Sequence, residues 1–381
     1  MTPRRFLDRV PTPIKVLLVF GALYLFIVGI GSMSAAFKLM GKDYTHALLG
    51  SRAGPLVALF IGILATSFVQ SSSTTTTIIV SLVANDIIGY DSAIYMVMGA
   101  NVGTTVTNTI VSLAHITRSV EFQRAFAAAT VHDFFNMLVL VVLFPLEIAT
   151  GVLSGIAKQA TVAFEGVGGV KFASPIKIIT KPVIDLLKDL VEMMGGGGGV
   201  LAILGLLMTF ATLIMLVKVL RSIMVTKLEN LFDRVLFKSA GRALFLGFAL
   251  TVLVQSSSIT TSVAVPLVGA GIITLRQVLP YTMGANVGTT VTALLAAMAA
   301  LAGADPAVSE EMAKAMLGVR LAFFHVLFNV TGVAILWFVR PIPIKIAESF
   351  ARLAMWNRFV PIVYLILAFF VIPGLVIWLG R

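Results

Sequence analysis

Seven stretches of the chain are long and almost entirely apolar, and polar or charged residues separate them. Each stretch reaches the roughly 20 residues that an α-helix needs to cross the hydrocarbon core of a bilayer. The pattern therefore predicts an all-α polytopic membrane protein. The seven stretches lie near residues 14–37, 92–113, 122–146, 199–220, 275–301, 316–339 and 359–379.

Two further apolar regions, residues 54–88 and 240–273, are interrupted in the middle by the polar sequence Gln-Ser-Ser-Ser (QSSS). Each half is about 14 residues long, which is too short for a helix to cross the membrane. We predict re-entrant helical hairpins, in which one half-helix enters the membrane, the chain turns at QSSS, and a second half-helix leaves on the same side. Irregular backbone is tolerated at that depth only where it is buried in protein or lines a wet cavity.

The composition supports a membrane protein. Of the 381 residues, 59% are hydrophobic and only 12% are charged, which is too much apolar surface for a soluble protein of this size to bury. The net charge of +11 does not indicate a nucleic-acid partner, because the basic residues lie in short loops between apolar stretches. The chain has no cysteine, and its Asn329-Val330-Thr331 glycosylation sequon lies in an apolar stretch. Both features favour the inner membrane of a bacterium.

The QSSS sequence belongs to an internal duplication. With a constant offset of 185 residues, 23 of the 42 positions in Thr66–Thr107 and Thr251–Thr292 are identical without a gap, and both copies end in MGANVGTTVT. Further along, HDFFN at residues 132–136 matches HVLFN at residues 325–329. Agreement over this length indicates two structural repeats.

Counting the predicted crossings shows how the repeats are related. Each repeat holds one spanning helix, one hairpin and two more spanning helices, so it crosses the membrane three times. An odd number places the start of the second repeat on the opposite side, which predicts an inverted repeat of the kind found in secondary transporters. The predicted parts are the first repeat at 1–150, an outside linker at 151–198, the second repeat at 199–340 and a C-terminal spanning helix at 341–381.

The loop charges predict a cytoplasmic N-terminus. With this orientation, the cytoplasmic segments carry 16 of the 28 Lys and Arg residues, as the positive-inside rule requires. The outside linker has a helical pattern at Ile176–Met194, which predicts a helix lying in the membrane interface. Five glycines, Gly195–Gly199, follow it as a flexible joint. The cytoplasmic segments are 1–15, 114–124, 218–242 and 340–358.

The repeated polar clusters suit an anion together with a hard cation. Each QSSS precedes an apolar helical run, and the N-terminus of a helix offers free N–H groups and a partial positive charge. Two such ends from inverted repeats form a donor-rich pocket near the midplane. Neither QSSS segment contains Arg or Lys, so an oxyanion there needs positive charge from elsewhere. Sodium fits, because amide, hydroxyl and carbonyl oxygens can coordinate it, and the glycines of GANVGTT permit unwound backbone.

The two QSSS motifs, the two GANVGTT motifs and VHDFFN together resemble the type II sodium-dependent phosphate cotransporter family. The resemblance covers about residues 10–150 and 198–375. It implies import of inorganic phosphate driven by the sodium gradient, with the QSSS segments of both repeats forming the site. The predicted phosphate-binding residues are Gln70, Ser71, Ser72, Ser73, Thr74, Gln255, Ser256, Ser257 and Ser258. The predicted sodium ligands are Thr66, Gln70, Asn101, Thr104, Asp133, Asn136, Thr251, Gln255, Asn286, Thr289 and Asn329.

Asp133 breaks the symmetry of the duplication, because Val326 occupies its position in the second repeat. A carboxylate in an apolar run is costly, so we predict that it serves a sodium site. The resemblance implies that an Asp after this His goes with electrogenic transport, with three sodium ions for each phosphate. His132 and His325 are either proton carriers or structural residues. Asn136 and Asn329 suit helix packing and ion coordination equally well.

Three alternatives remain at this stage. The first is a sodium-coupled transporter of another small oxyanion, such as arsenate or sulfate. The second is an intramembrane hydrolase, which is disfavoured because adjacent His132 and Asp133 point about 100° apart on a helix and G-x-S-x-G is absent around QSSS. The third is a phosphate sensor or scaffold without transport. No enzymatic activity and no organic cofactor are predicted; sodium, phosphate and the lipid bilayer are the expected partners.

Overall fold

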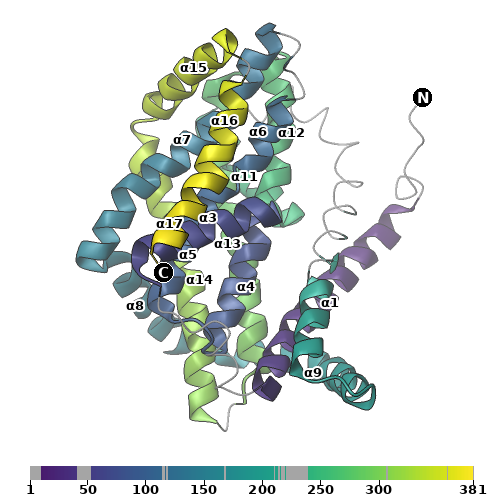
Figure 1. Cartoon of the computed structure of the whole chain (residues 1–381). Helices are drawn as coiled ribbons and strands as arrows, with labels where there is room; N and C mark the ends of the chain where they lie inside the picture. Colours follow the sequence, from purple (N-terminus) through teal and green to yellow (C-terminus); the bar gives the residue numbers. More distant parts are fainter. Residues whose placement is uncertain are drawn as a thin grey trace.

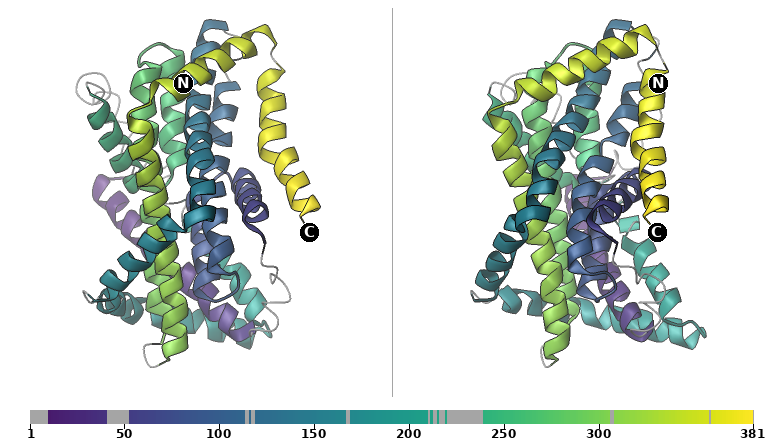
Figure 2. Two further views of the ribbon diagram at one scale, coloured as in Figure 1. Left: turned by 90° about the vertical axis from the view of Figure 1, so that its left-hand side faces the viewer. Right: turned by 60° about the vertical axis from the view of Figure 1, so that its left-hand side comes forward.

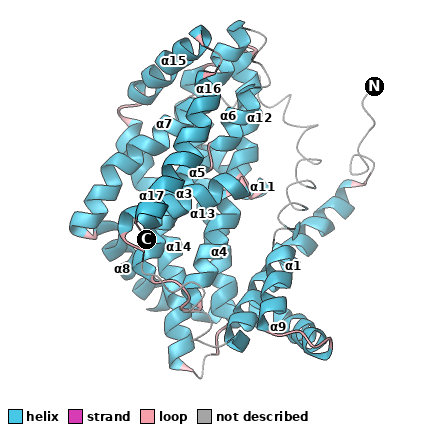
Figure 3. Ribbon diagram, in the orientation of Figure 1, coloured by secondary structure: helices cyan, strands magenta, loops and turns pink. Residues whose placement is uncertain are grey.

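The computed structural model describes residues 10–40, 53–113, 116, 119–166, 169–209, 211–212, 215, 219, 239–305, 308–357 and 359–380. Throughout these residues the regular structure is helical, without any strand (Figure 3). The prediction of an all-α polytopic membrane protein is thereby confirmed. Five helical segments in the described part are long and apolar enough to span a bilayer, and they match five of the predicted stretches. They are Pro13–Met33, Val120–Thr150, Leu275–Gly303, Ser309–Trp337 and Val360–Leu379.

Three long helices, α7 (Ser119–Thr150), α13 (Leu275–Gly303) and α14 (Ser309–Trp337), pack against one another and form the centre of the bundle (Figure 1). Their mutual contacts bury a large apolar cluster that includes Phe135, Leu279 and Phe324. The C-terminal segment runs along the outside of this bundle as α16 (Val360–Ile366), a π-helical turn η3 (Leu367–Val371) and α17 (Ile372–Leu379). Most of its apolar side chains are exposed, as expected for a helix that faces lipid.

Each QSSS sequence lies at a turn between two short helices. The first pair is α3 (Pro55–Val69) and α4 (Ser72–Ala84), and the second is α11 (Ala240–Val254) and α12 (Ser257–Gly269). The sequence predicted breaks at these places, and the helices are too short to span a bilayer. That both segments enter and leave the membrane on one side stays a prediction.

The first helix of each pair packs backbone to backbone on the helix that carries the GAN sequence. Helix α3 lies on α5 (Tyr90–Gly103), and α11 lies on α13. A Cβ atom added at Gly62 would collide with the Met96 carbonyl oxygen, and one added at Gly247 would collide with the Tyr281 carbonyl oxygen. These glycines therefore hold each QSSS turn close to the GANVGTT sequence of its own repeat.

We expect Gly247→Ala to destabilise the protein strongly. Overpacking typically costs about 1–3 kcal/mol, and here the obstacle is backbone of α13, which cannot rotate away. Gly241→Ala is the matched control, because it lies in the same helix and its added Cβ would meet nothing within 4 Å. The measurement is the thermal unfolding midpoint in detergent. Equal midpoints for the two variants would show that α11 can move away from α13 without loss.

One predicted span differs from the structure. Residues 92–113 were expected to form one helix, but α5 ends at Gly103 and a separate helix α6 (Val106–Leu113) follows a turn at Thr104–Thr105. The same MGANVGTTVT sequence is continuous within α13, so local propensity does not cause the break. Thr105 is a neighbour of the buried Asp133 carboxylate, which has no counterpart in the second repeat. The difference therefore arises from tertiary contacts, and Asp133 is one residue near the break that the second repeat lacks.

Amphipathic helices cover both ends of the bundle (Figure 2). Helix α15 (Pro341–Trp356) lies across one end, and α8 (Val152–Gly166) and α9 (Gly169–Met193) lie towards the other. The helix predicted within the linker at Ile176–Met194 is thus present as part of α9, which packs along α1 (Thr12–Met40) and α13.

Of the predicted stretch 199–220, a helix at Gly198–Thr209 is described, and much of the remainder lies outside the described residues. The division into repeats at 1–150 and 199–340, with the linker 151–198 between them, stays a prediction.

Candidate functional site

The two QSSS turns have nearly the same backbone geometry. Gln70 (φ 57°, ψ 23°) and Gln255 (φ 54°, ψ 26°) both adopt the left-handed conformation that ends the preceding helix. Ser71 and Ser256 then cap the following helices, each accepting a hydrogen bond from a backbone N–H three residues on. A serine N-cap is among the preferred ones, so the shared sequence explains the shared turn.

A side-chain bond fastens each turn to the threonine that ends the GANVGTTVT sequence of the same repeat, in α6 for the first repeat and in α13 for the second. The Thr107 hydroxyl group donates to Gln70 Oε1 over 2.8 Å, and the Thr292 hydroxyl group donates to Gln255 Oε1 over 2.7 Å. Each glutamine Nε2 also donates to a carbonyl oxygen of its own helix. Gln70 and Gln255 therefore have structural bonds in addition to the binding role predicted for them, and sequence reasoning missed this.

The two turns contact each other. Ser258 Oγ donates to the Gln70 carbonyl oxygen over 3.4 Å, across the boundary between the two repeats. Ser72 and Ser257 stand at the first positions of α4 and α12, where backbone N–H groups are free. Their hydroxyl groups form no hydrogen bond with another described residue. Ser73 Oγ is likewise buried without a partner. These hydroxyl groups are free to bind a small anion.

Thr66 and Thr251 lie one turn before the two glutamines and are fully buried. Neither hydroxyl group has a hydrogen-bond partner in the structure. Each side chain packs against the glycine that precedes the Thr-Thr pair, Gly103 or Gly288. A buried hydroxyl oxygen that lacks a partner normally requires an explanation, and a bound cation would satisfy both of them.

A chain of side-chain hydrogen bonds also connects the two repeats. The Asn286 amide donates through Nδ2 to Asn136 Oδ1 over 2.6 Å, and its Oδ1 lies 2.8 Å from His132 Nε2. His132 Nδ1 lies 3.2 Å from Asn108 Nδ2, and Asn108 Oδ1 accepts from the Thr261 hydroxyl group over 3.0 Å. Both ring nitrogens of His132 are therefore occupied by neutral amides.

Asp133 is completely buried on α7. Its Oδ2 accepts from the Tyr364 hydroxyl group over 3.1 Å and lies 3.5 Å from the Thr109 hydroxyl oxygen, whereas its Oδ1 has no partner. No Lys, Arg or His forms an ion pair with it in the part of the chain that the structure describes. A carboxylate oxygen buried in this way, without a compensating charge, is suited to a cation.

Several predicted sodium ligands are bonded to their own helices. Thr104 and Thr289 donate to carbonyl oxygens four residues earlier, as does Asn101, while Asn329 donates to the His325 carbonyl oxygen. Their side-chain oxygens can still accept or coordinate, but these bonds are purely local. Thr74 is bonded within its turn to Ser71.

The structure adds four residues that the sequence did not single out: Asn108, Thr109, Thr261 and Tyr364. The first three are polar positions in the helices that follow the shared motifs, which is the signal that could have revealed them. Tyr364 approaches from the C-terminal segment, more than 230 positions away in sequence, and no local pattern marks it. The described residues hold no cluster of three or more His, Cys, Asp or Glu suited to a metal ion.

Comparison with known proteins gives consistent results. A family profile described as Na+/Pi-cotransporter matches residues 25–171 and 206–356. Sodium-dependent phosphate transport protein 2A of Rattus norvegicus is 32% identical over 438 residues, which cover 95% of this chain and 67% of that protein. Sodium-dependent phosphate transport protein 2B of Homo sapiens is 30% identical over 453 residues, which cover 94% of this chain and 64% of that protein. The chain thus spans about two thirds of the length of these relatives. No solved structure matches it.

Proposed function

Because the chain belongs to the Na+/Pi-cotransporter family, we propose that it carries inorganic phosphate across a membrane together with sodium ions. The family is one of transporters rather than enzymes. The observation that carries the proposal is the contact between the two QSSS turns, each of which begins a half-helix whose first serine hydroxyl group bonds to no other described residue. Phosphate is a small oxyanion that such donors bind.

The phosphate site comprises Ser71–Thr74 of the first repeat and Ser256–Ser258 of the second, with Gln70 and Gln255 holding the turns. Within it, Ser72 and Ser257 are the direct ligands, because their hydroxyl groups are not used by the protein. Ser71 and Ser256 contribute as helix caps. No basic side chain belongs to either turn, so the charge of phosphate must be balanced by co-transported cations.

The sodium sites are the buried oxygens beside the turns. Thr66 and Thr251 each offer a hydroxyl group without a partner, next to Gly103 and Gly288. Asp133 offers an unpartnered carboxylate oxygen. Hydroxyl, amide and carboxylate oxygens are the ligands that hard cations prefer. With two neutral sites and one at Asp133, three sodium ions accompany each HPO4 and the cycle moves one net positive charge.

Transport proceeds by alternating access, with the two inverted repeats moving against each other around the QSSS turns. The distribution of Lys and Arg favours a cytoplasmic N-terminus. The absence of cysteine favours the bacterial inner membrane. A hydrolase is disfavoured by the structure, because amides of Asn108 and Asn286 occupy both ring nitrogens of His132, so that this histidine does not activate a serine.

Phosphate uptake into proteoliposomes tests this function. An inward sodium gradient should drive accumulation of radiolabelled phosphate, and an equal potassium gradient should not. Arsenate, which keeps a proton as HPO4 does, should compete better than sulfate, because sulfate cannot donate a hydrogen bond to the site. Uptake that is indifferent to sodium, or preferential transport of sulfate, would contradict the proposal.

A further inference from the structure

The duplicated His and Asn residues are bonded differently in the two repeats, although their sequences match. His132 and Asn136 of α7 correspond to His325 and Asn329 of α14, and Asn286 of α13 corresponds to Asn101 of α5. In a symmetric molecule, His132 would bond to Asn286 just as His325 would bond to Asn101. The structure contains only the first of these pairs.

The first repeat reaches across to the second through both of its residues. Asn286 Nδ2 donates to Asn136 Oδ1, so Asn286 Oδ1 accepts from His132 Nε2. His132 Nδ1 then accepts from Asn108 Nδ2, since Asn108 Oδ1 already accepts from Thr261. His132 is therefore the neutral tautomer with its proton on Nε2, and this arrangement satisfies both of its nitrogens.

The second repeat lacks the reciprocal bonds. His325 is 1% exposed, and neither of its ring nitrogens has a partner. Asn329 does not reach α5 but donates to the carbonyl oxygen of His325 in its own helix. Two unsatisfied nitrogens on one buried ring are unusual in a native protein, and this points to a partner that is present in another conformation.

The two QSSS turns show the same asymmetry between the repeats. Ser258 of the second repeat donates to the Gln70 carbonyl oxygen of the first. Its counterpart Ser73 should donate to the Gln255 carbonyl oxygen, but Ser73 Oγ is buried without a partner. Bonds are thus missing at two separate places. At each place the group without a partner has a counterpart in the other repeat that is hydrogen-bonded.

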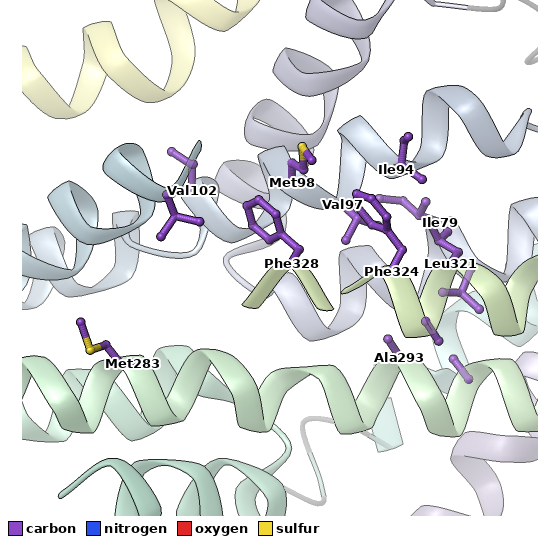
Figure 4. Packing of buried hydrophobic residues seen from close by; sticks show 14 of the residues in the cluster. Ile79, Ile94, Val97, Met98, Val102, Met283, Ala293, Leu321, Phe324 and Phe328 are labelled. Atoms are coloured by element: carbon purple, nitrogen blue, oxygen red, sulfur yellow. The ribbon is translucent and has the colours of Figure 1, made fainter. Parts of the chain in front are cut away.

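The helix that carries His325 already packs against the helix that carries its expected partner, Asn101. Helix α14 packs on α5 as α7 packs on α13, and Figure 4 shows Phe324 and Phe328 of α14 beside Val97 and Met98 of α5. Met98 begins the Met-Gly-Ala-Asn sequence that ends in Asn101. The exchange proposed below requires α14 to move relative to α5, so that the His325 ring reaches the Asn101 amide.

We propose that the two His–Asn pairs exchange during transport. In the conformation seen here, His132 and Asn136 hold Asn286; in the oppositely facing conformation, His325 and Asn329 hold Asn101, and His132 releases Asn286. This exchange rests on the proposed alternating-access function, and it assigns to each of the two states the residues that stabilise it. Since Asn101 and Asn286 are also candidate sodium ligands, the exchange presents one of them to the ion in each state.

The exchange is not fully symmetric. Asn108, which holds the second nitrogen of His132, corresponds to Ala293 in the other repeat. The conformation seen here therefore has one bond, between His132 and Asn108, that the opposite state cannot form. Without ligands, the conformation seen here should be the more populated of the two.

Alanine variants test the exchange through the sidedness of phosphate affinity. The quantity to measure, in proteoliposomes of known orientation, is the ratio of the half-saturating phosphate concentrations for influx and efflux. His132→Ala should change this ratio by roughly tenfold, because it removes a bond from one state only. His325→Ala removes a bond from the other state and should change the ratio in the opposite direction. The double variant should return towards the wild-type ratio. Shifts in the same direction, or no recovery in the double variant, would show that the histidines only support the fold.

A second measurement does not depend on phosphate transport, so its result is distinguishable from failure of the proposed function. The chain has no cysteine, so His132→Cys/Asn286→Cys and Asn101→Cys/His325→Cys can each be bridged by mercuric ion without background. Without ligands, the His132→Cys/Asn286→Cys pair should be bridged in most molecules and the Asn101→Cys/His325→Cys pair only in a minority, because the conformation seen here is the more populated one. If both pairs respond alike, or the Asn101/His325 pair never bridges under any gradient, the exchange does not occur.

Discussion

Replacing Ser257 with alanine should raise the phosphate concentration needed for half-maximal uptake by roughly tenfold to a hundredfold, because a hydrogen bond to a charged ligand contributes about 1.5–3 kcal/mol. Ser72→Ala should have a similar effect. Both hydroxyl groups lie at the N-terminus of a half-helix and form no bond with another described residue. Their removal should therefore weaken binding of phosphate with little loss of folding stability. The measurement is sodium-driven uptake over a range of phosphate concentrations.

Ser262→Ala is the matched control for Ser257→Ala. It lies in the same helix, α12, but its hydroxyl group donates to the Ile259 carbonyl oxygen of that helix and should leave phosphate affinity unchanged. The double variant Ser72→Ala/Ser257→Ala should be weaker than either single one if both serines touch the same ion. A serine whose replacement leaves both affinity and rate untouched is not a ligand.

The turns themselves could be predicted because their chemistry is local. In each Gln-Ser-Ser-Ser sequence the glutamine adopts the left-handed conformation and the first serine caps the following helix. The backbone angles of the two copies differ by only a few degrees. The glycines that allow α3 to approach α5, and α11 to approach α13, also lie in the shared motifs. The duplication thus revealed which parts of the chain come together at each turn.

The differences between the repeats could not be predicted from the same motifs. Gly-Thr-Thr ends α5 near Thr104 but is continuous in α13, and His132 is fully bonded whereas His325 is not. Identical local sequences have identical local preferences, so only tertiary contacts can separate them. Those contacts depend on residues without a counterpart, such as Asp133 and Asn108, and on the conformation that the two halves adopt.

Tyr364 illustrates a second limit. Its hydroxyl group reaches Asp133 from α16, which is followed by the π-helical turn Leu367–Val371. Nothing in the periodicity of Val360–Leu379 distinguishes this tyrosine from an interfacial aromatic residue. The Asp133 carboxylate, in contrast, was identifiable from the sequence. Burying an acidic side chain in an apolar run costs free energy, so such a residue generally has a function.

The charge moved in each cycle should depend on Asp133. A hard cation gains a large interaction energy from a carboxylate oxygen in a medium of low dielectric constant, and Asp133 Oδ1 is buried with no partner in the protein. Under the proposed stoichiometry, three sodium ions and one HPO4 carry one net positive charge inwards in each cycle. Asp133→Gly should lose the third ion, so that two sodium ions balance one phosphate and the cycle becomes electroneutral.

The distinguishing quantity is the phosphate-dependent current for each phosphate transported in reconstituted liposomes, together with the sodium Hill coefficient. For Asp133→Gly, uptake should persist at high sodium while the current falls to zero and the membrane potential ceases to drive transport. Asp91→Asn controls for the loss of a carboxylate, because Asp91 is exposed in the first turn of α5, and its current should match that of the wild type. A variant of Asp133 that kept the wild-type current per phosphate would remove this carboxylate from the ion site. Asp133 would then be a structural partner of Tyr364 and Thr109, and the third sodium ion would have to bind to neutral oxygens elsewhere.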